Sequence, residues 1–200
     1  IRNGGLASHG ATIGIILAIW LCSRKNRVPM MWMTDRLGVI APISGALIRF
    51  GNLFNSEIIG HQTDMPWGFK FMRLYKGLPA EQVPACHPTQ LYEALCYMVT
   101  FGVLLWLYCS KDLGRRRPGL LFGGAMIGIF LTRFFIEFLK ERQVDFEMGM
   151  ALDMGQLLSI PFIILGVVMI ARSFMRPEVA DINAVMQHTV DEYKREDKKR

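Results

Sequence analysis

The 200-residue chain is long enough for one compact domain, but its composition excludes an ordinary soluble one. Hydrophobic residues make up 52% of the chain and charged residues only 20%, and the mean hydropathy is +0.27. The formal net charge of +6 lies mostly in short segments between apolar runs, so it indicates membrane topology rather than nucleic-acid binding. We therefore predict an all-α, polytopic integral membrane protein.

Five apolar runs are predicted to cross the membrane as helices: 4–23, 29–48, 94–109, 119–132 and 154–171. The second run is the weakest because it contains Asp35 and Arg36. We expect its helix to begin at Thr34 or Asp35 and to break or bend near Pro42. The fourth run is rich in glycine, which lets membrane helices approach one another closely.

Residues 1–176 are predicted to form one transmembrane catalytic domain. Within it, the polar segment 61–87 is too long for a simple connection, so we expect a small folded unit or a functional loop there. A short strand or interfacial segment is expected within 65–71. The mixed charges of residues 177–200 predict a solvated tail, either frayed or an amphipathic helix, on the cytoplasmic side.

Basic residues are distributed unevenly among the segments that join the apolar runs. Segments 24–36 and 111–117 each hold four basic residues and one acidic residue, whereas 49–93 and 133–153 hold at least as many acidic as basic residues. Cytoplasmic loops of membrane proteins carry an excess of Lys and Arg. Segments 24–36 and 111–117 are therefore predicted to be cytoplasmic, and 49–93 and 133–153 to face outward.

The end of the second run carries a dense group of polar side chains. Arg49, Asn52 and Asn55 are spaced three apart, so they share one face if the helix continues. Glu57 does not fit that face, which predicts that the chain leaves the helix between residues 51 and 60. This group is either a functional site or a membrane-edge cap in which Arg49 extends to the lipid headgroups.

The predicted topology brings many polar residues to outward-facing helix ends. Two of them have simpler interpretations, since Arg133 and Glu137 could form a local i,i+4 ion pair and His9 could be an interfacial histidine. Together they predict a polar cavity with two arginines, which suits phosphate because a guanidinium binds phosphate oxygens bidentately. The set is His9, Arg49, Asn52, Asn55, Glu57, His87, Gln90, Tyr92, Glu93, Arg133, Glu137, Asp153 and Gln156.

Five motifs, in order along the chain, resemble those of the bacterial prolipoprotein diacylglyceryl transferase family. Residues 4–10 read Gly-Gly-Leu-Ala-Ser-His-Gly, residues 49–60 match Arg-x-Gly-Asn-x-x-Asn-x-Glu-x-x-Gly, and residues 87–93 read His-Pro-Thr-Gln-Leu-Tyr-Glu. Residues 133–138 and 155–159 are similar to two later motifs. The motif at 49–60 is the most specific of the five.

The resemblance implies seven helices, of which these would be the last five. Because the chain begins at Ile1 rather than Met, we expect a fragment that lacks an N-terminal part. A tyrosine that is common in the family is Ile129 here.

The implied reaction moves diacylglyceryl from phosphatidylglycerol to the lipobox cysteine of a prolipoprotein and releases glycerol-1-phosphate. It implies a multi-pass protein of the bacterial inner membrane with its site on the outer side, and no metal or cofactor. The implied catalytic residues are His9, Arg49, Arg133 and Glu57, with His9 the first candidate base and Glu57 the second. The implied substrate-binding residues are Arg49, Asn52, Asn55, Glu57, Gly60 and Tyr92.

Two other classes of protein remain as alternatives. A transporter or binder of anionic lipid headgroups would place polar residues along the whole depth of its helices. A structural membrane subunit would not need the motif at 49–60.

Overall fold

The computed structural model describes residues 8–141, 152–178 and 182–197, and most of them are helical. The helices are α1 (Ser8–Asn26), α2 (Met30–Asn55), α3 (Thr89–Lys111), α4 (Leu113–Arg116), α5 (Leu120–Ile136), α6 (Met154–Met175) and α7 (Ile182–Asp197), with a 3-10 turn η1 (Glu137–Leu139) after α5. Two short strands, β1 (Phe69–Lys70) and β2 (Ala85–Cys86), pair antiparallel.

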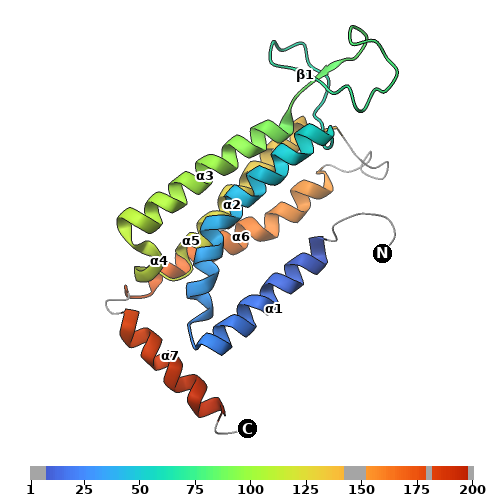
Figure 1. The fold of residues 1–200 in the computed structure, drawn as a ribbon. Coiled ribbons are helices and arrows are strands. Elements are labelled where there is room, and N and C mark those ends of the chain that lie inside the picture. Colours follow the sequence, from blue (N-terminus) through green and yellow to red (C-terminus); the bar gives the residue numbers. More distant parts are fainter. Residues whose placement is uncertain (1–7, 142–151, 179–181, 198–200) are drawn as a thin grey trace.

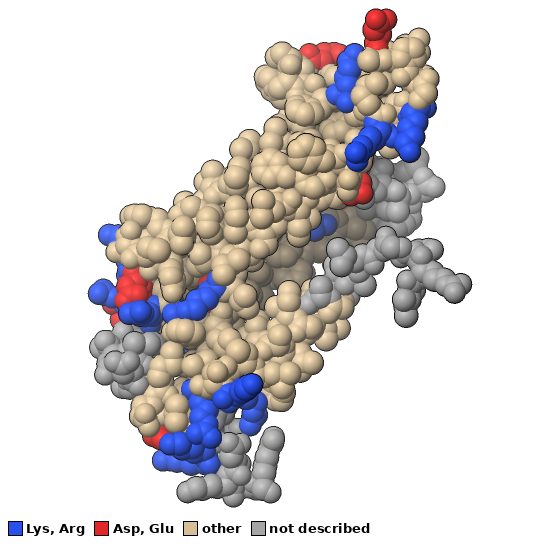
Figure 2. All heavy atoms as spheres, in the orientation of Figure 1, with Lys and Arg blue, Asp and Glu red and all other residues tan. Residues whose placement is uncertain are grey.

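Helices α2, α3, α5 and α6 run side by side as a bundle, with α1 alongside (Figure 1). These four are long and apolar enough to cross a membrane, which confirms a helical membrane protein. Large apolar side chains are exposed on their outer faces, and charged residues gather toward the two ends of the molecule (Figure 2). An exposed apolar belt between charged ends is the surface that a bilayer requires.

Close contacts between helices occur at glycines, as predicted for the fourth run. A Cβ atom at Gly123 would lie 2.8 Å from the carbonyl oxygen of Gly166, so α5 and α6 touch backbone to backbone there. At Gly128, the backbone of α5 packs directly against the Thr100 side chain of α3. These contacts hold α5 against α3 on one side and α6 on the other.

Helix α2 differs from its predicted form. It begins at Met30 rather than at Thr34 or Asp35. It is not broken at Pro42, which lies inside one helix that continues to Asn55; a bend at Pro42 stays a prediction. The charges of Asp35 and Arg36 thus lie inside the helix. Arg36 stacks on the Trp32 ring, 3.1 Å from its centroid, and Asp35 is completely buried.

Asp35 is buried because it caps the start of α5. Its Oδ2 accepts a hydrogen bond from the Gly119 N–H at 2.6 Å, and its Oδ1 accepts one from the Phe122 N–H at 2.9 Å. The first N–H groups of a helix have no partner within it, so a carboxylate there satisfies donors and complements the helix dipole. The expectation that Asp35 begins α2 is therefore wrong.

We expect Asp35→Ala to lower the stability of the protein by about 2 kcal/mol, because two N–H groups in a non-aqueous environment would lose their acceptor. Asp35→Asn keeps one acceptor oxygen and should cost less. Thermal unfolding in detergent, followed by circular dichroism, measures both. Equal melting temperatures for Asp35→Ala and wild type would contradict the capping role.

Residues 61–87 form a small folded unit, here called the lobe, at one end of the bundle (Figure 1). The β1–β2 pair and the bridge between Gln62 and Cys86 hold it together, and Phe71 and Cys86 are buried within it. The end of the bundle that carries the lobe is called the lobe end below. The segment predicted within 65–71 contains a strand, β1, at Phe69–Lys70.

Candidate active site

An arginine and a glutamate from different helices meet at the lobe end. Arg49, in the last two turns of α2, places its Nε 2.7 Å from Oε2 of Glu93, in the first two turns of α3. The Glu93 side chain is fully buried, and 14% of the Arg49 side chain is exposed. The Arg49 N–H does not point at this oxygen, so the contact is ionic without being a hydrogen bond. The structure therefore does not show Arg49 as a membrane-edge cap that extends to the lipid headgroups.

Lys140 extends this pair into a chain of four charges. Its Nζ lies 3.0 Å from Glu93 Oε1 and 2.9 Å from Glu137 Oε2, and only 6% of its side chain is exposed. The order is Arg49, Glu93, Lys140, Glu137, with opposite charges adjacent throughout. Charges in a low-dielectric interior are tolerated when paired in this way. The local pair considered between Arg133 and Glu137 is wrong, because Glu137 pairs with Lys140.

Arg133 is the cation of this region that lacks a carboxylate. Among the described residues it forms no ion pair, and its Nε is buried without a hydrogen-bond partner. Arg49 and Arg133 both lie within electrostatic range of the Tyr97 hydroxyl on α3.

The charges can be counted over this group. Three cations, Arg49, Arg133 and Lys140, face two carboxylates, Glu93 and Glu137, which leaves one positive charge. A half-buried guanidinium with an unused N–H is costly unless it binds an anion. The arrangement therefore suits one anionic group at Arg133.

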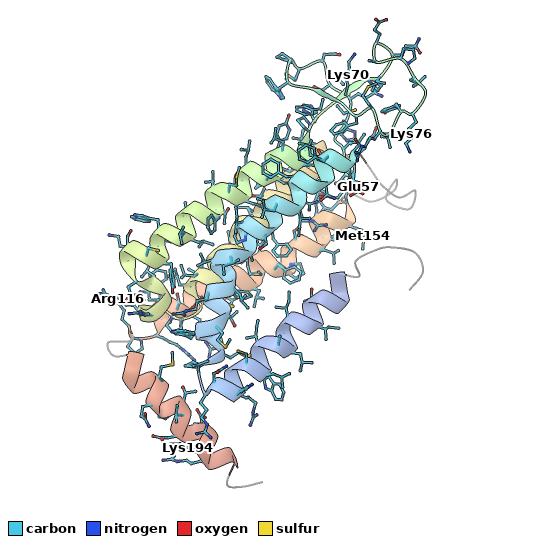
Figure 3. All side chains as sticks on the ribbon, in the orientation of Figure 1. Glu57, Lys70, Lys76, Arg116, Met154 and Lys194 are labelled. Carbon is cyan, nitrogen blue, oxygen red and sulfur yellow. The ribbon has the colours of Figure 1, made fainter. Side chains whose placement is uncertain are left out.

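The chain reverses after α2 and brings Glu57 back toward the helix. Ser56 adopts a left-handed conformation with φ 58°, and the Glu57 N–H donates to the Asn52 carbonyl at 3.0 Å. Asn52 Nδ2 then donates to Glu57 Oε2 at 3.0 Å, and Gln90 Nε2 donates to the Glu57 carbonyl at 2.6 Å. Glu57 thus lies outside the helix, as predicted, at the lobe end of the bundle (Figure 3). Its carboxylate is exposed and oriented by Asn52.

Gly60 lies where three segments cross. Its N–H donates to the His87 carbonyl at 3.0 Å, and it forms a β-bridge with Lys140. A Cβ atom here would lie 2.7 Å from both the His87 Cβ and the Leu139 carbonyl oxygen. Only glycine fits this space. Gly60 therefore positions the backbone from which the Lys140 side chain reaches Glu93.

Two predicted substrate-binding residues face the lobe instead of the charged chain. The Tyr92 hydroxyl accepts a hydrogen bond from Trp67 Nε1 at 2.8 Å and lies 3.2 Å from His87 Nδ1. Asn55 Oδ1 accepts a 3.5 Å hydrogen bond from Arg73. Their role in binding substrate stays a prediction. The side chain of His9 lies outside the described residues.

Two residues at the centre of the charged chain, Glu93 and Lys140, have no role predicted from the sequence. Glu93 is only one of thirteen polar residues predicted at outward-facing helix ends, and Lys140 is not among them. A signal for Lys140 was present, since it follows Glu137 by three residues and could compete with Arg133 for that carboxylate. Glu93, distant in sequence, makes Lys140 the better partner because it adds a second carboxylate.

Comparison with known proteins gives a consistent result. The sequence model of the family described as prolipoprotein diacylglyceryl transferase matches residues 1–172. Proteins named phosphatidylglycerol–prolipoprotein diacylglyceryl transferase are similar to this chain in Porphyromonas gingivalis (50% identity over 88% of this chain and 64% of the relative), Bacteroides fragilis (49%, 82% and 56%) and Chloroherpeton thalassium (42%, 90% and 64%). The chain thus spans less than two thirds of the length of these relatives. On the extent of this match, the chain belongs to the prolipoprotein diacylglyceryl transferase family.

Proposed function

We propose that this protein transfers the diacylglyceryl group of phosphatidylglycerol to the thiol of a lipobox cysteine in a prolipoprotein. A C–S thioether bond forms, the C–O bond between diacylglyceryl and phosphate breaks, and glycerol-1-phosphate leaves. The observation that carries the proposal is the uncompensated guanidinium of Arg133 beside Arg49 at the lobe end. The names of the family members support the choice of substrates.

The proposed chemistry needs cations where the phosphate gains charge. Arg133 has no carboxylate partner among the described residues, so it is the primary phosphate ligand. Arg49 is held by Glu93 Oε2 through Nε, which leaves its terminal nitrogens to turn toward the Tyr97 hydroxyl and the phosphate. Preorganised cations in a site with little water stabilise a leaving group without reorganising first.

A tyrosine on α3 contributes a hydroxyl to this arrangement. Tyr97 is 3% exposed and packs with Ala46, Ala94 and Ile129, the residue that stands where a tyrosine is common in the family. Its hydroxyl lies within electrostatic range of both Arg49 and Arg133. We infer that Tyr97 supplies, from the neighbouring helix, the hydroxyl that Ile129 lacks.

The attacking sulfur must lose its proton, since the thiolate is the nucleophile. His9 is the proposed base because an imidazole accepts protons near neutral pH. Glu57 is the second candidate, and its support is structural: an exposed carboxylate that Asn52 orients by one hydrogen bond. Asn52, Asn55, Gly60 and Tyr92 are proposed to line the space for the headgroup and the lipobox.

The transporter alternative lacks a supporting observation. The charged residues of α3 and α5 are Glu93, Lys111 and Arg133, all within two turns of a helix end. The Asp35 carboxylate is engaged by the start of α5 and does not line a path. Charges confined to the ends of the helices favour a one-sided site.

We propose that α1 is a fifth membrane span and that the lobe end faces outward across the bacterial inner membrane, as the distribution of basic residues implies. A cysteine at Lys76, exposed on the lobe, should react with a membrane-impermeant thiol reagent added to spheroplasts, whereas one at Asn26 should not. Both are placed in a cysteine-free background. Native Cys86 is a poor reporter because it is fully buried, and burial raises the pKa of its thiol. Labelling of both positions from one side would contradict the five-span topology.

The catalytic proposal is tested by Arg49→Lys in the complete gene product, with phosphatidylglycerol and a lipobox peptide as substrates. We expect at least a tenfold loss of transfer, because lysine keeps the charge but cannot contact Glu93, Tyr97 and phosphate together. The matched control is Arg116→Lys, an exposed arginine at the end of the bundle opposite the lobe (Figure 3), which should retain activity. Wild-type transfer by Arg49→Lys would rule out a bidentate role for Arg49.

A further inference from the structure

A second cationic pocket lies at the lobe end, between the end of α2 and strand β1. Its volume is about 270 Å³. It is separate from the charged chain, because none of its lining residues belongs to that chain. The lining residues are Leu53, Phe54, Ser56, Phe69, Lys70, Phe71, Met72 and Arg73.

The two cations of this pocket have no counter-ion among the residues that the structure describes. Lys70 Nζ donates to the Ala80 carbonyl at 2.9 Å, and Arg73 Nη1 makes only the 3.5 Å hydrogen bond to Asn55 Oδ1. Within the described ranges, neither side chain contacts a carboxylate. Both neutral partners leave most of the donor capacity of Lys70 and Arg73 free. The pocket is therefore electropositive and suited to a phosphate.

The walls of the same pocket are apolar. Leu53 packs against the buried cluster of Ile59, Phe71 and Cys86 and forms the inner wall. At the rim, Phe54 is 73% exposed and Met72 is 44% exposed. Phe54 stands in the last turn of α2, one of the four helices apolar enough to cross a membrane. Its side chain thus lies where a membrane span gives way to the lobe.

The pocket combines cations with exposed apolar side chains at the end of a membrane span, and this combination matches a phospholipid. The phosphate of a phospholipid would face Lys70 and Arg73, while its glycerol backbone and upper acyl carbons would contact Phe54 and Met72. A water-soluble anion would use the cations but would leave Phe54 and Met72 exposed.

We propose that this pocket binds the headgroup phosphate of an anionic bilayer phospholipid, which is held there and not consumed. The bound lipid would fix the lobe to the membrane surface beside α2. The proposal goes beyond the transfer reaction and does not depend on it, because it concerns binding at residues outside the charged chain.

The experiment measures retention of phosphatidylglycerol by the complete gene product, carried in an Arg133→Gln background that removes the proposed catalytic phosphate ligand. Protein from nanodiscs of phosphatidylcholine with 30% phosphatidylglycerol is released into detergent and analysed by native mass spectrometry. Arg73→Gln and Lys70→Gln should each weaken retention about tenfold, as expected for the loss of one charged hydrogen bond. Arg73→Lys should retain most of the binding.

Lys76→Gln is the matched control, since it removes the same charge from an exposed lobe position outside the pocket (Figure 3). An equal loss of lipid with Lys76→Gln would show only diffuse surface attraction and would overturn the proposal. The alternative to lipid binding is a purely structural role, in which Arg73 offsets the partial negative charge at the C-terminus of α2. If Arg73→Gln lowers the melting temperature while lipid retention is unchanged, that role is the whole explanation and the pocket is not a lipid site.

The ligand class is tested by competition. Soluble poly-glutamate should not displace phosphatidylglycerol if the apolar rim takes part in binding, and displacement at equal charge concentration would point to an acidic protein segment instead. Should Arg73→Gln fail to fold, Lys70→Gln and Arg73→Lys still decide the outcome. Failure of the transfer reaction itself would leave these retention results unchanged.

Discussion

Replacing Arg133 with glutamine is expected to abolish diacylglyceryl transfer, with a loss of at least about 100-fold, the range found when one preorganised donor to a developing charge is removed. Arg133 carries the positive charge that the carboxylates of Glu93 and Glu137 do not balance, and its Nε has no partner. A phosphate that gains charge at this position would lose its main counter-charge in the variant.

The same substitution should leave stability unchanged or slightly raised. A buried charge without a partner destabilises the folded protein, so its removal relieves a cost rather than adding one. Loss of activity without loss of stability is typical of a residue kept for function. Melting temperature and transfer rate, measured on the same detergent preparation, separate this outcome from simple misfolding.

Glu137→Gln is the control for Arg133. Because Glu137 pairs with Lys140 and not with Arg133, the variant removes one ionic contact while Lys140 keeps its contact with Glu93. We expect a milder loss of transfer than with Arg133→Gln. Equal loss in both variants would mean that Arg133 depends on Glu137, and wild-type transfer by Arg133→Gln would refute the phosphate-binding role.

Parts of the site that follow from local periodicity could be predicted from the sequence. The i,i+3 spacing of Arg49 and Asn52 placed both on one helix face, and the apolar runs placed Arg49, Glu93 and Arg133 at one end of the bundle. Helix length and hydropathy also determined the membrane class. Each of these inferences uses the spacing, hydropathy or charge of individual segments, without contacts between them.

The remaining parts depend on contacts between residues that are distant in sequence. Asp35 reads locally as a loop charge before a helix, yet its carboxylate caps α5, whose first residues follow more than 80 positions later. Lys140 could pair with Glu137 by spacing alone, but only the approach of Glu93 buries its ammonium group. The packing around Gly60 joins three segments, and no periodicity in the sequence encodes it.

Glu93→Gln is expected to produce the largest loss of stability of any single substitution in the site. Glu93 is fully buried and, among the described residues, is the one carboxylate that contacts both Arg49 and Lys140. A neutral amide leaves both cations with an unbalanced charge, and breaking a buried ion pair in this way costs about 3–5 kcal/mol. Thermal unfolding in detergent should show the loss directly, and transfer should fall as well, because Arg49 would no longer be held.

A double-mutant cycle with Lys140→Met distinguishes a coupled network from two independent effects. If Glu93 stabilises the fold by pairing with Lys140, the variant Glu93→Gln with Lys140→Met should be more stable than the sum of the single losses predicts, because the second change removes a charge that the first left unpaired. Lys140→Met alone leaves Glu93 paired with Arg49 and should cost less than Glu93→Gln. Strictly additive losses would show that the two side chains do not interact. The charged chain would then consist of two independent ion pairs, one between Arg49 and Glu93 and the other between Lys140 and Glu137. Coupling between Glu93 and Lys140 would instead mean that the 3-10 turn after α5 helps to hold Arg49 at the phosphate, through a lysine that contacts no substrate.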